Sequence, residues 1–124
     1  RPYSISSPAT ERAYYEITIR KTQSGFVSDY LLKKLKVGDR LTSSGPAGNF
    51  YRVPDGHGQR LVFIAGGSGI TPFMSMLQTD FAKLNRDYSI DLIYGCASDK
   101  DILFESRLRK LEKERDEFRL VILP

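Results

Sequence analysis

The sequence predicts a two-part fold: the C-terminal portion of an antiparallel β-barrel, followed by the N-terminal portion of an α/β domain with a parallel sheet. Residues 14–20 (YYEITIR) alternate between polar and apolar side chains, which is typical of a half-buried antiparallel strand. From residue 60 onward, continuous apolar runs alternate with helical patterns, as they do in parallel α/β domains. The pattern changes within residues 54–58, so we expect residues 1–56 and 57–124 to form separate domains.

The first part contains one predicted helix between two extended segments. Residues 27–36 (VSDYLLKKLK) have leucines at helical spacing, and we expect Leu31, Leu32 and Leu35 to face inward and the lysines outward. A turn then leads into a second expected strand at residues 40–44. We expect three or four strands in this part in all, which is too few to close a barrel of the usual size.

The second part has predicted strands and helices in alternation. The expected strands are residues 60–65 (RLVFIA), 90–95 (IDLIYG) and 118–123 (FRLVIL). This order predicts a parallel sheet with right-handed crossovers. The sequence stops one residue after the last strand, which would have an unpaired apolar edge. We therefore expect a central segment of a longer chain, with both domains incomplete.

Two helices are expected to connect these strands. The first should begin with Thr71 as its N-cap and with Pro72 at the first helical position, where a missing N–H costs nothing. The second is expected over residues 101–115, with a charged outer face. The expected core-facing residues are Phe73, Leu77, Phe81 and Leu84 in the first helix, and Phe104, Leu108 and Leu111 in the second.

The composition limits the classes of protein. The chain has 124 residues, of which 40% are hydrophobic and 27% charged, and this argues against disorder. Its net charge of +4 accompanies no nucleic-acid-binding motif, so we expect no nucleic-acid partner. No apolar run approaches the ~20 residues that span a bilayer, so no membrane span is expected. The single cysteine, Cys96, excludes an internal disulfide and favours a reducing compartment, the cytoplasm. No metal site is expected.

The segment IAGGSGITP, residues 64–72, follows the first apolar strand and precedes a helix. Glycines let a ligand approach the backbone, and free N–H groups at the start of a helix favour an anion such as phosphate. The segment is not a P-loop, because no lysine precedes the serine or threonine, and Pro72 replaces the third glycine of G-x-G-x-x-G. A phosphate site is one interpretation, and a glycine turn that serves only close packing is the other.

The first residues form a second candidate group. Arg1 can form a forked pair with a phosphate, Tyr3 offers a flat face for stacking, and Ser4 can donate and accept a hydrogen bond. An edge strand with its polar side chains in solvent is the alternative. Further along, Gly25-Phe26-Val27-Ser28 precedes a helix. Ser28 is either a plain N-cap or part of a nest of N–H groups that binds an anion.

The order of these motifs resembles that of a known family. Arg-x-Tyr-Ser is followed by Gly-x-x-Ser before a helix, by Gly-Pro-x-Gly-x-Phe at residues 45–50, and by Gly-Gly-Ser-Gly-Ile-Thr-Pro. The series resembles the ferredoxin–NADP reductase superfamily, and in particular the flavin reductase components of bacterial oxygenases. The resemblance covers nearly the whole chain.

The resemblance implies that the first domain is a partial FAD-binding β-barrel. Arg1 would pair with the flavin phosphate, Tyr3 would stack on the isoalloxazine, and Ser4 would hydrogen-bond near N5. A pyrophosphate bound between residues 25 and 28 would favour FAD over FMN. The further implied flavin contacts are Ile17, Ile19, Gly25, Val27 and Ser28.

The second domain would, by the same resemblance, be a partial NAD(P)-binding α/β domain that takes NADH or NADPH as co-substrate. Its glycines would approach the pyrophosphate, and Thr71 would lie near the nicotinamide and flavin rings. Cys96 would lie near the adenosine side, although a small apolar filler is the other interpretation of it. Only Ser4 and Thr71 would have catalytic roles. The implied nucleotide contacts are Gly66, Gly67, Ser68, Gly69, Thr71, Pro72 and Cys96.

The implied function is that of an NAD(P)H-dependent flavoprotein oxidoreductase. Hydride would pass from the nicotinamide to flavin N5, and single electrons would then pass to an iron–sulfur protein or a fused ferredoxin-type domain. The alternatives are an electron-transfer subunit that runs in the reverse direction, and a flavin- or nucleotide-binding module without turnover. Ala97 and Ser98 follow the second strand without an arginine for a 2′-phosphate, which favours NADH.

Overall fold

The computed structural model describes residues 1–53, 59–82 and 88–123. Helix α1 (Phe26–Lys33) lies in the first part of the chain. In the second part the elements follow in the order β1 (Arg60–Gly66), η2 (Gly67–Gly69), α2 (Ile70–Phe81), β2 (Ser89–Gly95), η3 (Asp99–Asp101), α3 (Glu105–Glu114) and β3 (Phe118–Leu123), where η2 and η3 are short 3₁₀ turns.

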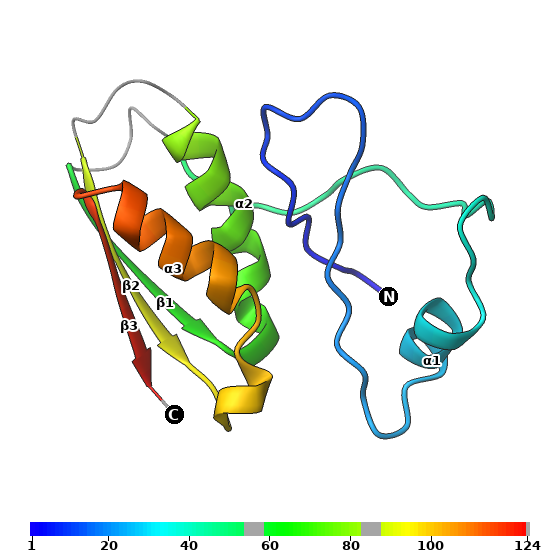
Figure 1. Cartoon of the computed structure of the whole chain (residues 1–124). Coiled ribbons are helices and arrows are strands. Elements are labelled where there is room, and N and C mark those ends of the chain that lie inside the picture. The colour runs from blue at the N-terminus through cyan, green and yellow to red at the C-terminus, as the bar shows by residue number, and fades with distance from the viewer. Residues whose placement is uncertain (54–58, 83–87, 124) are drawn as a thin grey trace.

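The strands form one parallel sheet in the order β1-β2-β3 (Figure 1). Strand β2 pairs with β1 on one side and with β3 on the other, so that Phe63, Leu92 and Leu120 lie in register across the sheet. The predicted parallel sheet is confirmed, and each strand agrees with its predicted range to within one residue at either end.

Helices α2 and α3 both lie on the same side of the sheet, and the hydrophobic core lies between them and the strands (Figure 1). Phe63 and Ala65 of β1 point into this core, whereas Val62 and Ile64 on the other face are 60% and 72% exposed. The continuous apolar run of β1 predicts burial on both faces. The structure corrects this, because no helix among the described residues covers the second face.

Helix α2 begins two residues before the predicted position. The turn η2 continues directly into it, because the Ile70 N–H bonds to the carbonyls of Gly67 and Ser68, and Gly69 is the N-cap. The expectation that Thr71 caps the helix is therefore wrong. Pro72 occupies the third helical position, where its missing N–H is still tolerated because the N–H groups of a first turn have no acceptor within the helix.

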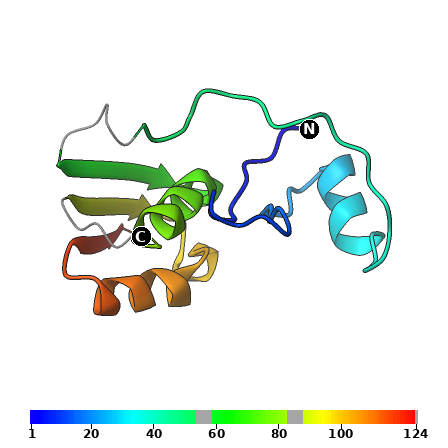
Figure 2. The ribbon, with the colours of Figure 1, turned by 90° about the horizontal axis from the view of Figure 1, so that it is seen from above.

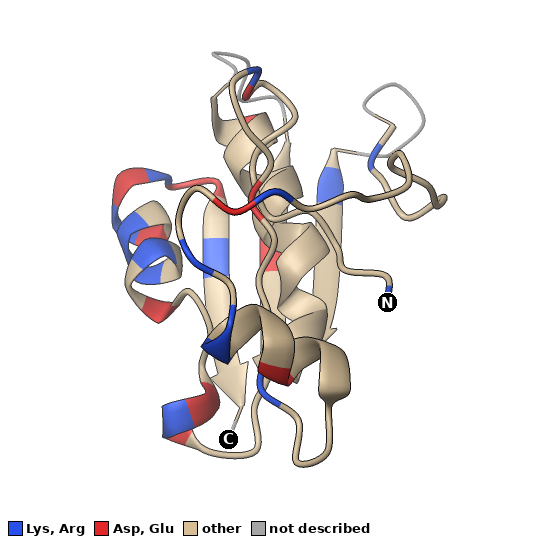
Figure 3. Ribbon diagram, turned by 90° about the vertical axis from the view of Figure 1, so that its right-hand side faces the viewer, with Lys and Arg blue, Asp and Glu red and all other residues tan. Residues whose placement is uncertain are grey.

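Helix α3 begins at Glu105, later than predicted. The turn η3 is separate from it, since Ile102 is extended and Phe104 has a φ of 60°, so the backbone between them is not helical. Acidic and basic residues are interspersed along α3, in agreement with its predicted charged face (Figure 3). An ion pair of 2.8 Å between Arg109 Nε and Glu105 Oε1 joins successive turns of this face.

The predicted core residues have different degrees of burial. The buried ones are Leu77, Phe81 and Leu108, and the partly buried ones packed against the core are Phe73, Phe104 and Leu111. Leu84 and the predicted domain boundary at residues 54–58 lie outside the described residues. The division into domains 1–56 and 57–124 therefore stays a prediction.

The first part of the chain contains little regular structure in the described residues. The predicted strand at residues 14–20 is reduced to one antiparallel bridge between Ile5 and Ile17, and residues 40–44 form no strand. A strand needs a neighbour to satisfy its backbone, and here that pairing extends only around this bridge. Tyr14 and Tyr15 are 56% and 75% exposed. The barrel stays a prediction.

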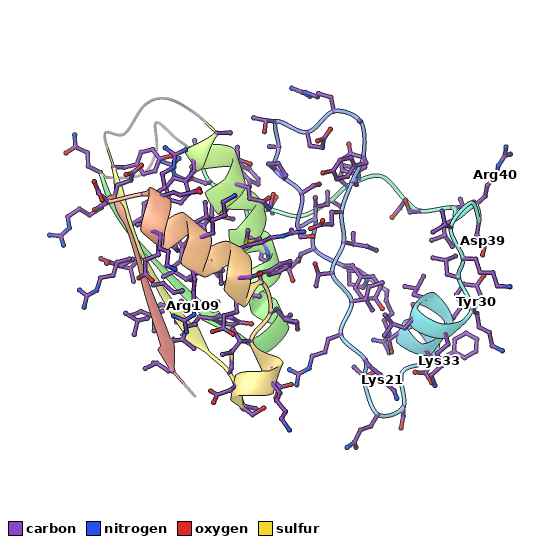
Figure 4. All side chains as sticks on the ribbon, viewed as in Figure 1. Lys21, Tyr30, Lys33, Asp39, Arg40 and Arg109 are labelled. Atoms are coloured by element: carbon purple, nitrogen blue, oxygen red, sulfur yellow. The ribbon has the colours of Figure 1, made fainter. Side chains whose placement is uncertain are left out.

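Helix α1 ends at Lys33, three residues before the predicted end. The N–H groups of Lys34 and Leu35 both donate to the Tyr30 carbonyl, which closes the helix. Leu32, which was expected to face inward, is 48% exposed. Tyr30 and Lys33 lie on the side of α1 that faces away from the sheet (Figure 4). The lysines are exposed, which confirms their predicted outward position, whereas the predicted inward position of Leu32 is wrong.

Candidate cofactor-binding site

The glycine turn at the carboxyl end of β1 leaves its backbone open. A Cβ added at Gly66 or at Gly69 would meet no atom within 4 Å, so an atom of a ligand can approach the backbone there. Gly67 has a φ of +49°, a left-handed conformation that glycine adopts without strain. The turn then opens α2. This is the arrangement that binds phosphate groups at the carboxyl edge of parallel sheets.

Thr71 closes this turn from inside the helix. Its side chain is buried, and Oγ1 donates to the Ser68 carbonyl at 2.9 Å. In a regular helix the N–H at position 72 would donate to the Ser68 carbonyl, but Pro72 has no N–H. The Thr71 hydroxyl thus gives the Ser68 carbonyl a donor in addition to the Ile70 N–H, and its position is fixed by that bond.

Tyr94 supports the turn from the next strand. Its ring is fully buried, and its hydroxyl donates to the Gly67 carbonyl at 3.0 Å and accepts the Leu103 N–H at 3.1 Å. Burial raises the pKa of the Tyr94 phenol to about 12, so the hydroxyl keeps its proton at neutral pH. The sequence placed Tyr94 only at the end of a strand, on the adenosine side of the expected nucleotide, and did not reveal the role of its hydroxyl. Its signal was a tyrosine at the end of a buried strand, where the hydroxyl needs a partner.

Arg20 brings a positive charge to the same turn. Its Nη2 pairs with Asp101 Oδ1 at 2.6 Å, and its Nη1 would lie 3.4 Å from a Cβ added at Gly67. The other oxygen of Asp101 accepts the Ser98 hydroxyl at 2.8 Å. Arg20 was predicted only as the end of a strand. Its position at the glycine turn depends on a partner 81 residues away in the sequence, which no local pattern reveals.

The first residues leave their side chains accessible. Arg1 and Ser4 are exposed and Tyr3 is half-buried, and none of the three has a side-chain hydrogen bond to the part of the chain that the structure describes. Ile17, which pairs with Ile5, is 42% exposed. The structure thus brings residue 17 beside the segment that contains Arg1, Tyr3 and Ser4, as the predicted flavin strand requires.

Ser6 and Ser7 follow this segment directly and are almost completely buried, at 0% and 3% exposure. The interpretation of the segment as an edge strand with solvent-facing polar side chains is wrong for these two serines. They lie against α2, where Ser75 Oγ donates to the Ser7 carbonyl at 2.7 Å and Gln78 Nε2 donates to the Ser6 carbonyl at 3.0 Å. Sequence reasoning missed Ser75 and Gln78 because it examined only the apolar side of the helix.

The loop before α1 is closed by Ser28. Its hydroxyl donates to the Gly25 carbonyl at 3.0 Å and lies 3.2 Å from Thr22 Oγ1. A Cβ at Gly25 would overlap with the side-chain oxygens of both Thr22 and Ser28, so these side chains would have to move to admit any other residue. Gly25 is the N-cap, which corrects the interpretation of Ser28 as a plain N-cap. Val27 is half-buried in the first turn of α1.

A buried ion pair joins the first part of the chain to the end of α2. Arg52 Nη1 and Asp80 Oδ1 lie 2.6 Å apart, with side-chain exposures of 9% and 4%. The Arg52 guanidinium also lies 4.3 Å from the centre of the Tyr88 ring. Burial, with a further contribution from the charge of Asp80, raises the pKa of the Tyr88 phenol. This pair attaches residue 52 to the helix that begins at the glycine turn.

Cys96 is part of the hydrophobic core at the end of β2, and its N–H donates to the Leu123 carbonyl at 2.9 Å. This agrees with the interpretation of Cys96 as an apolar filler. In the described ranges, no three histidine, cysteine, aspartate or glutamate side chains come together as metal ligands. No helix within these ranges is long and apolar enough to cross a bilayer.

Two domain families match the chain. The oxidoreductase FAD-binding domain matches residues 1–51, and the oxidoreductase NAD-binding domain matches residues 63–124. The expected cofactor types, FAD and a nicotinamide adenine dinucleotide, are confirmed as those of the family.

Curated relatives align with nearly the whole chain. The glycine betaine monooxygenase reductase subunit of Chromohalobacter salexigens is 32% identical over 123 residues, covering 99% of this chain and 33% of that protein. NADH-cytochrome b5 reductase 1 of Aspergillus terreus is 34% identical over 125 residues, covering 97% of this chain and 42% of that protein. The chain therefore spans well under half of the length of these relatives.

Solved structures of the same fold include the FAD/NAD-binding domain of nitric oxide dioxygenase from Vibrio cholerae. Its TM-score is 0.86 and its sequence is 29% identical. The alignment covers 98% of this chain and 51% of the chain in the solved structure. The ferredoxin-NADP⁺ reductase of Plasmodium falciparum has a TM-score of 0.83 and 29% identity, covering 99% of this chain and 50% of that one. Since the domain matches, the relatives and the backbone all agree with the motif order, this chain belongs to the ferredoxin–NADP reductase superfamily of flavin-dependent oxidoreductases.

Proposed function

We propose that this chain is part of an NADH-dependent flavoprotein reductase, which passes electrons from the nicotinamide through FAD to a protein acceptor. The observation that carries this proposal is the glycine turn between β1 and α2, whose backbone is open at Gly66 and Gly69. The match to an FAD-binding domain precedes this turn along the chain. A monooxygenase reductase subunit and an NADH-cytochrome b5 reductase are among the relatives, which supports both the donor and the direction.

The loop before α1 fits the pyrophosphate of FAD. The side chains of Thr22 and Ser28 lie so close to Gly25 that an added Cβ would overlap with both of them. The first N–H groups of α1 have no acceptor within the helix and would bind the pyrophosphate, at Gly25, Val27 and Ser28. The Ser28 hydroxyl keeps the loop in shape through its bond to the Gly25 carbonyl.

The first residues fit the remainder of the flavin. The exposed guanidinium of Arg1 would pair with a phosphate oxygen, and the half-buried ring of Tyr3 would stack on the isoalloxazine. The Ser4 hydroxyl, which is exposed, would donate a hydrogen bond near N5. Ile17 and Ile19 would contact the side chain of the cofactor.

The glycine turn fits the pyrophosphate of the nicotinamide nucleotide. Its backbone is open to a ligand, and the Arg20 guanidinium beside Gly67 would add a charge that favours phosphate. Thr71 is held in place by Ser68 and would shape the nicotinamide site. The proposed nucleotide contacts are Gly66, Gly67, Ser68, Gly69, Thr71 and Pro72, with Arg20 added.

When bound, the two cofactors supply the redox chemistry, in which a hydride (two electrons and one proton) moves from nicotinamide C4 to flavin N5. The chain's own residues align the rings and exclude water, so no side chain has to act as an acid or base. Ser4 and Thr71 are the side chains proposed to lie at the reacting rings. An iron–sulfur protein or a fused ferredoxin-type domain is the proposed acceptor, in line with the motif order of oxygenase reductases.

Rapid-mixing reduction of the full-length protein tests the proposal. The absorbance of its bound flavin should bleach with NADH, and more slowly with NADPH at the same concentration. The Tyr3→Ser variant should retain less FAD than the Tyr15→Ser variant, because Tyr15 is 75% exposed and serves as the control for loss of a tyrosine ring. Binding of the nucleotide without any bleaching would refute the reductase and leave a binding module without turnover.

A further inference from the structure

Helix α2 presents a row of polar side chains to the first part of the chain. Thr71, Ser75, Gln78 and Thr79 recur at helical spacing and so lie along one side of the helix. All four are buried or half-buried. The first residues of the chain run beside this helix (Figure 2). Buried polar groups need hydrogen-bond partners, and the row below Thr71 finds them in residues 6–9.

Two of these side chains bind the carbonyls of the buried serines. Ser75 Oγ lies 2.7 Å from the Ser7 oxygen, and Gln78 Nε2 lies 3.0 Å from the Ser6 oxygen. Both contacts are made to backbone atoms. They therefore fix the path of the chain in this segment, whichever side chains the segment carries.

Thr79 adds a hydrogen bond in which the helix side chain is the acceptor and the segment is the donor. The Ala9 N–H donates to Thr79 Oγ1 at 2.8 Å, while the Thr79 hydroxyl donates to the Ser75 carbonyl within the helix at 2.7 Å. The segment thus gives two carbonyls and one N–H to the same side of α2. Such a set resists both sliding along the helix and rotation about it.

The same segment is held independently within the first part of the chain. The Ser6 N–H donates to the Glu16 carbonyl at 2.7 Å, and the Glu16 N–H donates to Ser7 Oγ at 3.1 Å. Thr18 Oγ1 donates to Ser6 Oγ at 3.1 Å. Loss of the bonds to α2 would leave this pairing in place. The bonds to α2, together with an ion pair of 3.2 Å between Arg107 of α3 and Glu16, therefore hold the segment against the second part of the chain.

We propose that Ser75, Gln78 and Thr79 are positioning residues that set the distance and angle between the flavin and the nicotinamide. The inference rests on the proposed function, which puts the nucleotide at the first turn of α2 and the flavin at the residues just before Ser6. One helix then forms part of the first site and holds the segment that forms the second. Reacting atoms must lie about 3–3.5 Å apart, and a displacement of 1 Å can cost about 100-fold in rate.

The test uses the full-length protein with the double substitution Ser75→Ala and Gln78→Met, which removes both donors and keeps good helix formers. Its FAD content and its dissociation constant for NADH should stay within twofold of the wild type. The rate constant for flavin reduction at saturating NADH should fall on the order of 10- to 100-fold. A primary isotope effect with NADH deuterated at C4 should persist, which would assign the loss to the hydride step.

Two control variants separate positioning from stability. Ser75→Thr keeps the hydroxyl and should restore the rate. Ser106→Ala makes the same kind of change on α3 at an exposed side chain that has no hydrogen bond in the described part, and it should have no effect. If the double variant does not fold, Gln78→Met alone is measured in its place.

Hydrogen exchange gives a readout that does not need turnover. The amide of Ala9 should exchange faster in Thr79→Val and in the double variant, while the amides of β2 remain protected. Wild-type reduction rates in a variant with a faster-exchanging Ala9 amide would overturn the inference, and so would a loss of FAD or of global stability that accounts for the slower rate. A wild-type protein that bound no FAD, or was not reduced by NADH, would instead overturn the proposed function, and Ala9 exchange would still report the contacts.

Discussion

Replacing Tyr94 by phenylalanine tests whether one buried hydroxyl holds the glycine turn. The substitution keeps the ring in the core and removes the bonds to the Gly67 carbonyl and the Leu103 N–H, at 3.0 and 3.1 Å. Each such bond contributes about 0.5–1.5 kcal/mol, and a buried group left unpaired costs about 1–3 kcal/mol. Because Gly67 and Leu103 are themselves half-buried, water can reach them in part. We expect a loss of about 1–3 kcal/mol in the free energy of unfolding.

Urea unfolding of the full-length protein measures this loss, and calorimetric titration measures the affinity for NAD⁺. We expect an affinity about 10-fold lower, which corresponds to about 1.4 kcal/mol, because the turn loses its support. The FAD content should not change. Tyr15→Phe, a matched change at an exposed tyrosine, should lie within about 0.5 kcal/mol of the wild type. Unaltered stability and affinity in Tyr94→Phe would show that the hydroxyl does not hold the turn.

The same substitution predicts a pH dependence. The pKa of Tyr94 is about 12 in the folded protein because the ring is buried, against about 10 in an unfolded chain. Between pH 10 and pH 12 the tyrosine has released its proton in the unfolded state and keeps it in the folded state. The stabilisation that comes from the raised pKa of Tyr94 is therefore fully present below pH 10 and is lost as the pH rises toward 12. Relative to Tyr94→Phe, the wild type should lose up to about 1.4 kcal/mol per pH unit in this range. A parallel pH dependence of the two proteins would contradict the assignment.

Two further predictions concern the loop before α1 and the buried ion pair. Gly25→Ala should lower the FAD content of the purified protein, because its Cβ would overlap with Thr22 and Ser28, whereas Gly45→Ala, at a position with open space, should not. Asp80→Asn should lower the free energy of unfolding by about 3–5 kcal/mol, because it removes the carboxylate that neutralises buried Arg52. Asp29→Asn, which breaks the solvent-exposed pair with Lys33, should cost less than about 1 kcal/mol, and equal losses in the two variants would contradict this difference.

The second part of the chain could be predicted closely because its signals are local. Each strand is a short apolar run, and the side chains that meet across the sheet, such as Phe63, Leu92 and Leu120, belong to runs that the sequence displays directly. The start of α2 was misplaced because Thr71 is a good N-cap residue, whereas Gly69 is the N-cap in the structure. Thr71 and Pro72 favour a later start, but a 3₁₀ turn of glycines and serine can pass into the helix without a break.

The strands of the first part could not be predicted in the same way. Whether an alternating segment forms a strand depends on the segment beside it, and residues 14–20 meet a partner only around the bridge from Ile17 to Ile5. The alternation of polar and apolar residues was real, but alternation alone does not say which neighbour will pair with the backbone.

In the candidate site, too, the features that depend on neighbouring residues could be predicted, and those that depend on distant residues could not. The glycine turn was found because strand, glycines and helix follow one another in the chain. Tyr94 and Arg20 were missed because their partners in the site, Gly67 and Asp101, are 27 and 81 residues away. The local sequence does not identify the hydrogen-bond partner of a hydroxyl or a guanidinium. The partner is known only when the fold brings an acceptor within hydrogen-bond distance.

The polar side of α2 is the clearest case, because helical periodicity in a sequence identifies the apolar side of a helix and says nothing of what covers the polar side. The same spacing that makes Leu77 and Phe81 core residues also aligns Thr71, Ser75 and Gln78 on another side. A side that is polar in the sequence would ordinarily be assigned to solvent. Here the serines at positions 6 and 7 are buried against it, since their carbonyls need donors and the helix supplies them. Substitutions on the second and third turns of α2 should therefore alter the site without changing any residue that contacts a cofactor.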